Sequence, residues 1–210
     1  MSWESSQLYY QLINREVRQR LGGLHSAKLL MYSVDFAPLE KLQHAGDWEA
    51  AAKILIDAAR RIEAGGADFF LIGTNTMHQV ADAVSAAADI PLLHIADATA
   101  QVLKQEGVER VGLLGTAFTM ELDFYRDRIA GCHGIEVVVP EMHDRQMVHD
   151  IIYQELCQGQ IESESREIYL AIIDRLCEQQ IDGVILGCTE IGLLLQQQHT
   201  DIRLYDSTAI

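Results

Sequence analysis

The chain has 210 residues and a formal charge of −15 at pH 7, because 31 acidic residues outnumber 16 basic ones. Hydrophobic residues make up 49% and charged residues 22% of the chain, a balance typical of a globular protein rather than a disordered one. The negative charge argues against binding to nucleic-acid phosphates or to an anionic membrane surface. A small anionic substrate is still compatible with it, since clustered N–H donors can reverse the field inside a pocket.

Helices and strands alternate along the predicted chain. Helices are predicted over 3–21, 47–64, from about 77, over 97–106, 120–129, 145–157 and 163–179, and from about 190. Strands are predicted over 27–34, 68–72, 92–95, 111–114, 135–139 and 183–186. This alternation predicts an α/β fold whose parallel sheets are flanked by helices.

An internal repeat divides the chain into two halves. The segment DFFLIGT at 68–74 aligns with DGVILGC at 182–188, at an offset of 114 residues. We therefore predict two similar domains, 1–98 and 99–204, with 205–210 returning to the first domain. The same offset places the equivalents of 111–116 at positions −3 to 2, so we expect the opening strand of the first half to lie upstream of Met1.

The four cysteines show neither a zinc-binding nor a disulfide pattern. Their spacings of 25, 20 and 11 residues match no metal template. The sequence shows no N-terminal targeting segment, and no apolar run approaches the ~18 residues of a membrane span. We therefore expect a cytoplasmic protein with reduced thiols, no metal, and no nucleic-acid or membrane partner.

Three glycine-led turns follow predicted strands, at 73–76, 115–116 and 187–190. Ligands of parallel α/β sheets bind beyond the carboxyl ends of the strands, where N–H groups and hydroxyls can hold an anion. Thr74 and Cys188 occupy equivalent places in the two halves. If the halves face each other, these two residues approach one carbon from opposite sides, which suits removal and return of a proton.

Each candidate also has a structural interpretation. Cys188 is the best candidate base, since a strand-to-helix turn lowers a thiol pKa, whereas a buried cysteine can simply be a small hydrophobe. We favour the second interpretation for Cys132, Cys157 and Cys177. Thr74 is too weakly acidic to act as a base unaided. It could instead cap a helix, and so could Asn75, Thr76 and Thr116.

Several segments together resemble the aspartate/glutamate racemase family, whose members work without pyridoxal phosphate. They are MSWESS, LYYQLIN, LGGLHSA, SVDF, GTNTMH, HIADAT, LLGT, GCTEIGLL and YDSTAI, and they run from Met1 to Ile210. The resemblance implies two α/β domains related by a pseudo-twofold axis, with the active site between them, and a homodimer. It also implies a two-base racemisation of aspartate or glutamate, with a dicarboxylic amino acid as substrate and no cofactor.

The resemblance assigns roles to individual residues. Cys188 would take the α-proton from the L substrate, and Thr74, or a water it holds, would return one on the opposite face. The α-carboxylate or amino group would be bound by Asn75, Thr76, Thr116 and Thr189. Met1 and Gln43 match the substrate-contacting positions of the family's first two loops. Glu190 could hold the substrate ammonium, or could serve only as a first-turn helix carboxylate.

The chain departs from the family pattern in places. Thr74 stands where the usual member has a cysteine, as in the L-aspartate/glutamate-specific subgroup, so we expect a bias toward L substrates. The opening strand and the final helix of the family are also missing from the sequence. Two alternatives therefore stay open: another activity on small diacids, isomerisation or decarboxylation, and a non-catalytic amino-acid-binding protein.

Overall fold

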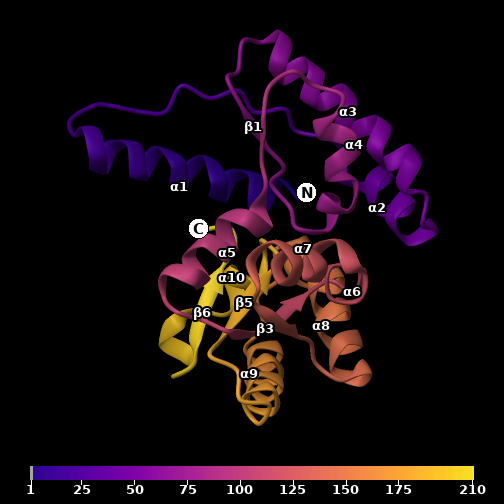
Figure 1. Ribbon diagram of the computed structural model, residues 1–210, viewed down its shortest axis with the longest axis vertical. Coiled ribbons are helices and arrows are strands. Elements are labelled where there is room, and N and C mark those ends of the chain that lie inside the picture. The colour runs from indigo at the N-terminus through magenta and orange to yellow at the C-terminus, as the bar shows by residue number, and fades with distance from the viewer. Residues whose placement is uncertain (1) are drawn as a thin grey trace. The chain divides into compact units, whose positions relative to one another are not determined.

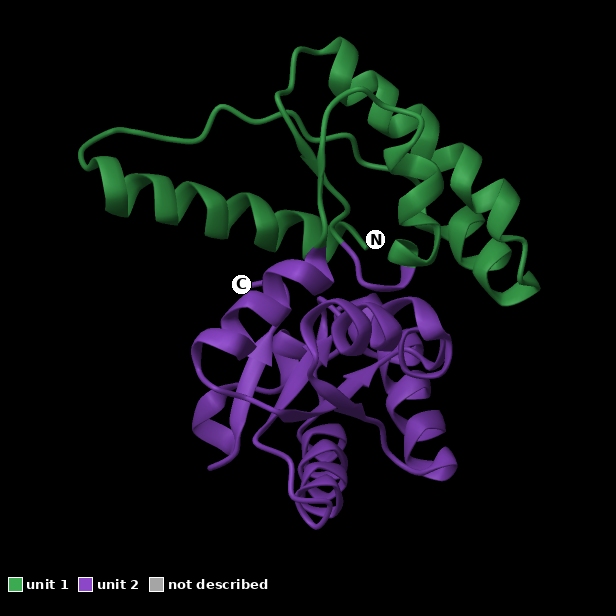
Figure 2. Ribbon diagram, in the orientation of Figure 1, with its two compact units in different colours: residues 1–73, 77–94 green, residues 74–76, 95–210 purple. Residues whose placement is uncertain are grey.

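The computed structural model describes residues 2–210, which form two compact units (Figure 2). The first unit runs from the start of the described residues to Gly73 and from Met77 to His94. The second comprises Thr74–Thr76 and Ile95–Ile210. The chain therefore changes unit at 73–77 and again at 94–95, whereas the sequence predicted boundaries after residues 98 and 204.

The second unit is built on a parallel sheet of four strands in the order β4-β3-β5-β6 (Figure 1). The strands are β3 (Arg110–Gly115), β4 (Glu136–Val138), β5 (Gly183–Gly187) and β6 (Arg203–Asp206). All five residues of β5 and five of the six in β3 are buried. Successive strand residues point to opposite faces, so helices must cover both faces of the sheet, as the sequence predicted.

Helices surround this sheet and enclose one apolar core. They are α5 (Ile95–Gln105), α6 (Ala117–Glu121), α7 (Asp123–His133), α8 (Met142–Gln154), η2 (Leu156–Gln158), α9 (Ser163–Cys177), α10 (Ile191–Leu194) and η3 (Gln197–His199). Strand residues Leu113 and Ile185 share this core with Val148 of α8 and Ile172 of α9. The core fixes the carboxyl ends of the strands, where the candidate site residues begin.

The first unit has a smaller core and a minimal sheet. Its elements are α1 (Trp3–Leu21), α2 (Phe36–Ala45), α3 (Trp48–Ala64), β1 (Phe70–Leu71), α4 (Ala81–Ser85) and β2 (Leu92–Leu93), with η1 (Thr76–Val80) entering it from the second unit. The predicted first helix is confirmed, and Ser2 caps it by accepting the N–H of Ser5 at 3.2 Å. β1 pairs in parallel with β2.

The internal repeat is visible in the strand pairing. Phe70 pairs with Leu92, and Val184, 114 residues after Phe70, pairs with Leu204. β5 pairs with β3 on its other side, whereas β1 pairs only with β2 among the described residues of the first unit. The β1–β2 ladder is thus the counterpart of the β5–β6 ladder.

One prediction of local structure was wrong, and one helix was not predicted. Residues 27–34 form no strand, because a strand needs a neighbour to satisfy its backbone groups and the described first unit offers them none. Helix α2 was missed, although Asp35 caps it by accepting the N–H of Ala37 at 3.3 Å.

Residues 205–210 belong to the second unit instead of returning to the first. Tyr205 pairs with Ile185 and is buried in the core of the second unit. Its hydroxyl donates to Glu106 at 2.9 Å. A fourth strand therefore ends at the same edge of the sheet as β3 and β5.

Candidate active site

The carboxyl ends of β3 and β5 approach each other closely at two glycines. A Cβ on Gly115 would lie 2.9 Å from the carbonyl oxygen of Gly187, and a Cβ on Gly187 would lie 2.7 Å from Leu113. Only glycine fits at these two positions without moving a neighbour. The turns that follow therefore start from adjacent points on the sheet.

Three buried threonine hydroxyls meet beside the end of β3. Thr76 Oγ1 lies 2.9 Å from Thr116 Oγ1 and 3.2 Å from Thr119 Oγ1, and the last two are 3.2 Å apart. Thr116 also caps α6, because its Oγ1 accepts the N–H of Thr119 at 3.3 Å. Hydroxyl protons can rotate, so this cluster can turn donors toward an anion.

Asn75 is held beside the cluster by the segment after β6. Its Nδ2 donates to Ser207 Oγ at 3.0 Å, and Ser207 Oγ donates to the carbonyl of Leu186 at 2.8 Å. The oxygen of the Asn75 side chain, Oδ1, is buried and has no hydrogen-bond partner among the described residues.

Cys188 lies at the end of β5 and points its thiol at a carboxylate. Its Sγ donates to Glu190 Oε2 at 3.1 Å, and Thr189 Oγ1 donates to the same oxygen at 2.7 Å. All three residues are buried. Glu190 makes no side-chain capping bond to α10. Its carboxylate instead accepts hydrogen bonds from the side chains of Cys188 and Thr189.

The expectation of a lowered Cys188 pKa was wrong. Burial raises the pKa of the thiol well above its usual value, and the nearby Glu190 carboxylate and Cys157 raise it further. The backbone N–H of Glu190 opposes this shift, but α10 has only four residues and offers a small dipole. The resting site therefore contains a neutral thiol that donates a hydrogen bond.

The other sequence candidates divide between the two units. Thr74 is half-buried and belongs to the second unit, as Cys188 does. Gln43 is buried in the first unit, where its Nε2 donates to the sulfur of Met77 at 2.9 Å. Met1 lies outside the described residues.

Thr119 and Ser207 contact the candidate residues but were not assigned to the site from the sequence. Thr119 stands three residues after Thr116, the spacing of a helix cap. Ser207 follows a strand of only four residues, which gives little apolar signal. Its position directly after a strand was the available clue.

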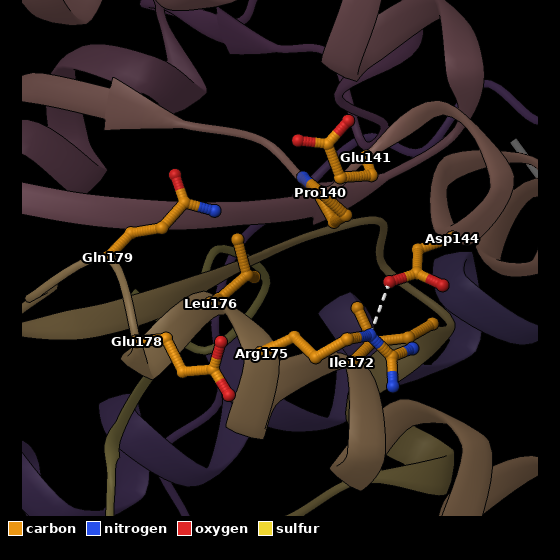
Figure 3. A pocket seen from close by; sticks show the side chains of 8 residues that line it. All are labelled: Pro140, Glu141, Asp144, Ile172, Arg175, Leu176, Glu178 and Gln179. Carbon is orange, nitrogen blue, oxygen red and sulfur yellow. Dashed lines mark hydrogen bonds and ion pairs between the residues drawn. The ribbon is translucent and has the colours of Figure 1, made fainter.

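One cavity of the second unit lies away from these residues. It has a volume of about 270 Å³ and contains the ion pair between Asp144 and Arg175, 2.7 Å long (Figure 3). Hydrogen bonding to Arg175 lowers the pKa of Asp144. Its lining residues are Pro140, Glu141, Asp144, Ile172, Arg175, Leu176, Glu178 and Gln179, none of them a candidate site residue.

Within residues 2–210, no three His, Cys, Asp or Glu side chains come together as a metal site. No described helix combines the length and apolar character needed to cross a membrane.

The fold and the cluster together define a parallel α/β protein with threonine, asparagine and cysteine turns at one sheet edge. The chain belongs to the Asp/Glu/hydantoin racemase family, whose model matches residues 1–210.

Solved structures and a curated relative agree with this family. A proposed Asp/Glu racemase from Yersinia pestis is 51% identical, covers 99% of this chain and 90% of its own, and has a TM-score of 0.90. An aspartate racemase homologue from Pyrococcus horikoshii OT3 is 34% identical over 98% of this chain and 89% of its own, with a TM-score of 0.82. The broad specificity amino-acid racemase RacX of Bacillus subtilis (strain 168) is 26% identical over 163 residues, 78% of this chain and 70% of RacX.

Proposed function

We propose that the protein is a cofactor-independent racemase that interconverts L- and D-aspartate or glutamate and favours the L substrate. The observation that carries this proposal is the buried thiol of Cys188 donating to the carboxylate of Glu190. Family membership supports the reaction class. Two of the alternatives, decarboxylation and simple binding, are outcomes of the test below.

The α-carboxylate of the substrate would bind at the threonine cluster. Removal of an α-proton leaves a carbanion whose charge must spread onto that carboxylate, since no cofactor takes it up. Hydroxyls of Thr76, Thr116 and Thr119 lie close enough together to turn their protons toward one carboxylate. Such pre-positioned donors stabilise the developing charge most strongly in a buried site.

Cys188 would act as the base after passing its proton to Glu190. The S–H bond breaks as the Glu190 carboxylate takes the proton, and the thiolate then removes the α-proton of the L substrate. This transfer keeps the net charge of the buried pair constant, which lessens the cost of forming an ion away from water. Thr189 would hold the Glu190 carboxylate in position, because its hydroxyl already donates to the same oxygen.

Thr74 would act on the opposite face of the α-carbon. A threonine hydroxyl is a far weaker acid than a thiol, so a water held by Thr74 would deliver the proton to the carbanion. Deprotonation from the Thr74 side is correspondingly difficult, and this difference supports a bias toward the L substrate. A homodimer stays a prediction, and so does a contribution of Met1 or Gln43 to binding.

Exchange of the α-hydrogen in deuterated water tests the proposal. L-Aspartate, L-glutamate and their D enantiomers are each incubated with the enzyme, and deuterium at the α-carbon is followed by proton NMR. We expect incorporation into an L substrate, with slow accumulation of the D product. Loss of carbon dioxide would indicate a decarboxylase, and binding without exchange would indicate a binding protein; either result contradicts the proposal.

A further inference from the structure

The hydrogen bonds of Ser207 determine which way the Asn75 amide faces. A hydroxyl has one proton to donate, and a carbonyl oxygen can only accept. The Ser207 proton is therefore committed to the carbonyl of Leu186, 2.8 Å away. Asn75, 3.0 Å from the same hydroxyl, must donate to it through Nδ2, and its Oδ1 must face elsewhere.

This orientation leaves an acceptor buried without a donor. Asn75 is 1% exposed, and its Oδ1 has no partner among the described residues. A buried carbonyl oxygen without a donor is unfavourable, and native structures rarely keep one.

We propose that Ser207 is a positioning residue that holds Asn75 as the acceptor for the α-ammonium group of the substrate. The inference rests on the proposed function and deepens it, because it assigns Asn75 to the amino group rather than the carboxylate. An amide oxygen attracts an ammonium and repels a carboxylate. The carboxylate is left to the hydroxyl cluster of Thr76, Thr116 and Thr119, which can donate.

The Asn75–Ser207–Leu186 hydrogen bonds also connect the turn after β1 with strand β5, which carries Cys188 at its end. Leu186 pairs with Asp206 in the sheet and lies two residues before Cys188. Ser207 thus ties Asn75 to the strand that presents the thiol. An ammonium bound at Asn75 would be held at a fixed position relative to Cys188, as proton removal from the adjacent α-carbon requires.

Paired ligands that differ only by the ammonium test this inference. L-Glutamate carries the group and glutarate lacks it, so we compare KM and kcat for the first with the inhibition constant of the second. Ser207→Ala frees the Asn75 amide to turn. We expect the KM for L-glutamate to rise about tenfold, as for loss of one hydrogen bond to a charged group, while kcat falls less and glutarate binds as before. Ser207→Thr keeps the hydroxyl and should restore the wild-type KM.

A second variant keeps the test valid if Ser207→Ala folds poorly. Asn75→Leu removes the acceptor directly, and it should abolish the preference for L-glutamate over glutarate. Adding Ser207→Ala to Asn75→Leu should then have no further effect on that preference. Equal weakening of both ligands, or of neither, in Ser207→Ala or Asn75→Leu would overturn the inference. Absence of exchange with every amino acid in the wild type would instead overturn the proposed function.

Discussion

The thiol of Cys188 donates a hydrogen bond to the carboxylate of Glu190 across 3.1 Å, and both groups are buried. The contact requires a protonated thiol, in agreement with the raised pKa of Cys188. A base that rests in its neutral form needs a nearby group to take its proton. Glu190 is close enough to take the thiol proton.

Removal of the Glu190 carboxylate should make proton abstraction depend on pH. In Glu190→Gln the thiol must lose its proton to solvent, so exchange at pH 7 should fall by about 10²–10⁴-fold, the usual contribution of a general base. Because burial alone still raises the pKa of Cys188 in this variant, the remaining rate should increase about tenfold per pH unit as the thiolate forms. A pH series of α-deuterium exchange on L-glutamate measures both effects.

A charge-matched variant controls for the loss of one negative charge. Glu164→Gln changes an exposed residue of α9 and should leave both the rate and its pH dependence unchanged. Wild-type exchange at pH 7 in Glu190→Gln would show that the carboxylate does not receive the thiol proton.

Thr116 should affect stability and binding together. Thr116→Val removes the cap of α6, which should cost about 1 kcal/mol of unfolding free energy, and it removes one hydroxyl from the cluster. Thr116→Ser keeps the hydroxyl and should resemble the wild type in both respects. Urea unfolding and the KM for L-aspartate measure the two effects, and an unchanged KM in Thr116→Val would exclude this hydroxyl from substrate binding.

Asp182 is predicted to stabilise the sheet through its two N–H contacts. Its Oδ2 accepts the N–H groups of Glu109 and Arg110, each at 2.9 Å, and these bonds lower the pKa of the carboxyl. A lowered folded pKa adds stability above the unfolded pKa of about 3.9, and this stability is lost as pH falls through the folded pKa. Asp182→Ala should therefore cost up to about 1 kcal/mol at pH 7, since the site is exposed, and much less at low pH.

The repeat supplies a control for this prediction. Asp68 is the equivalent of Asp182 at the offset of 114 residues, but it is exposed and accepts no such pair of N–H groups among the described residues. Asp68→Ala should leave the unfolding free energy within experimental error of the wild type. Equal losses in the two variants, at both pH values, would mean that the N–H contacts do not stabilise the sheet.

Replacing Thr74 with cysteine should reduce the bias between enantiomers. A thiol is acidic enough to become a base, so Thr74→Cys should raise exchange with the D substrate at least about tenfold. Exchange with the L substrate should change less, because Cys188 still removes that proton. Absence of any gain with D-aspartate and D-glutamate would contradict the placement of Thr74 on the opposite face of the α-carbon.

Sequence reasoning succeeded where a local pattern decides the structure. Helix α1 follows its apolar spacing, and β3 and β5 follow their buried runs. The repeat appears both in the sequence and in equivalent strand pairings, Phe70 with Leu92 and Val184 with Leu204. The strand predicted over 27–34 failed because an apolar run does not reveal whether a neighbouring strand exists.

The errors at the site have the same origin. The pKa of Cys188 depends on burial and on Glu190, both properties of the folded chain, while the turn alone suggested the opposite direction. Ser207 was missed because β6 is short and its pairing with β5 joins residues about 20 positions apart. Thr76 and Thr116 were named separately, but their contact at 2.9 Å required the structure.

The central claim is that the Cys188 thiol removes the α-proton, and one exchange experiment tests it most directly. Cys188→Ala and the matched control Cys132→Ala, an exposed cysteine of the same unit, are incubated with L-aspartate and L-glutamate in deuterated water. The account predicts no α-deuterium incorporation by Cys188→Ala and wild-type incorporation by Cys132→Ala. Wild-type incorporation by a folded Cys188→Ala protein would contradict it.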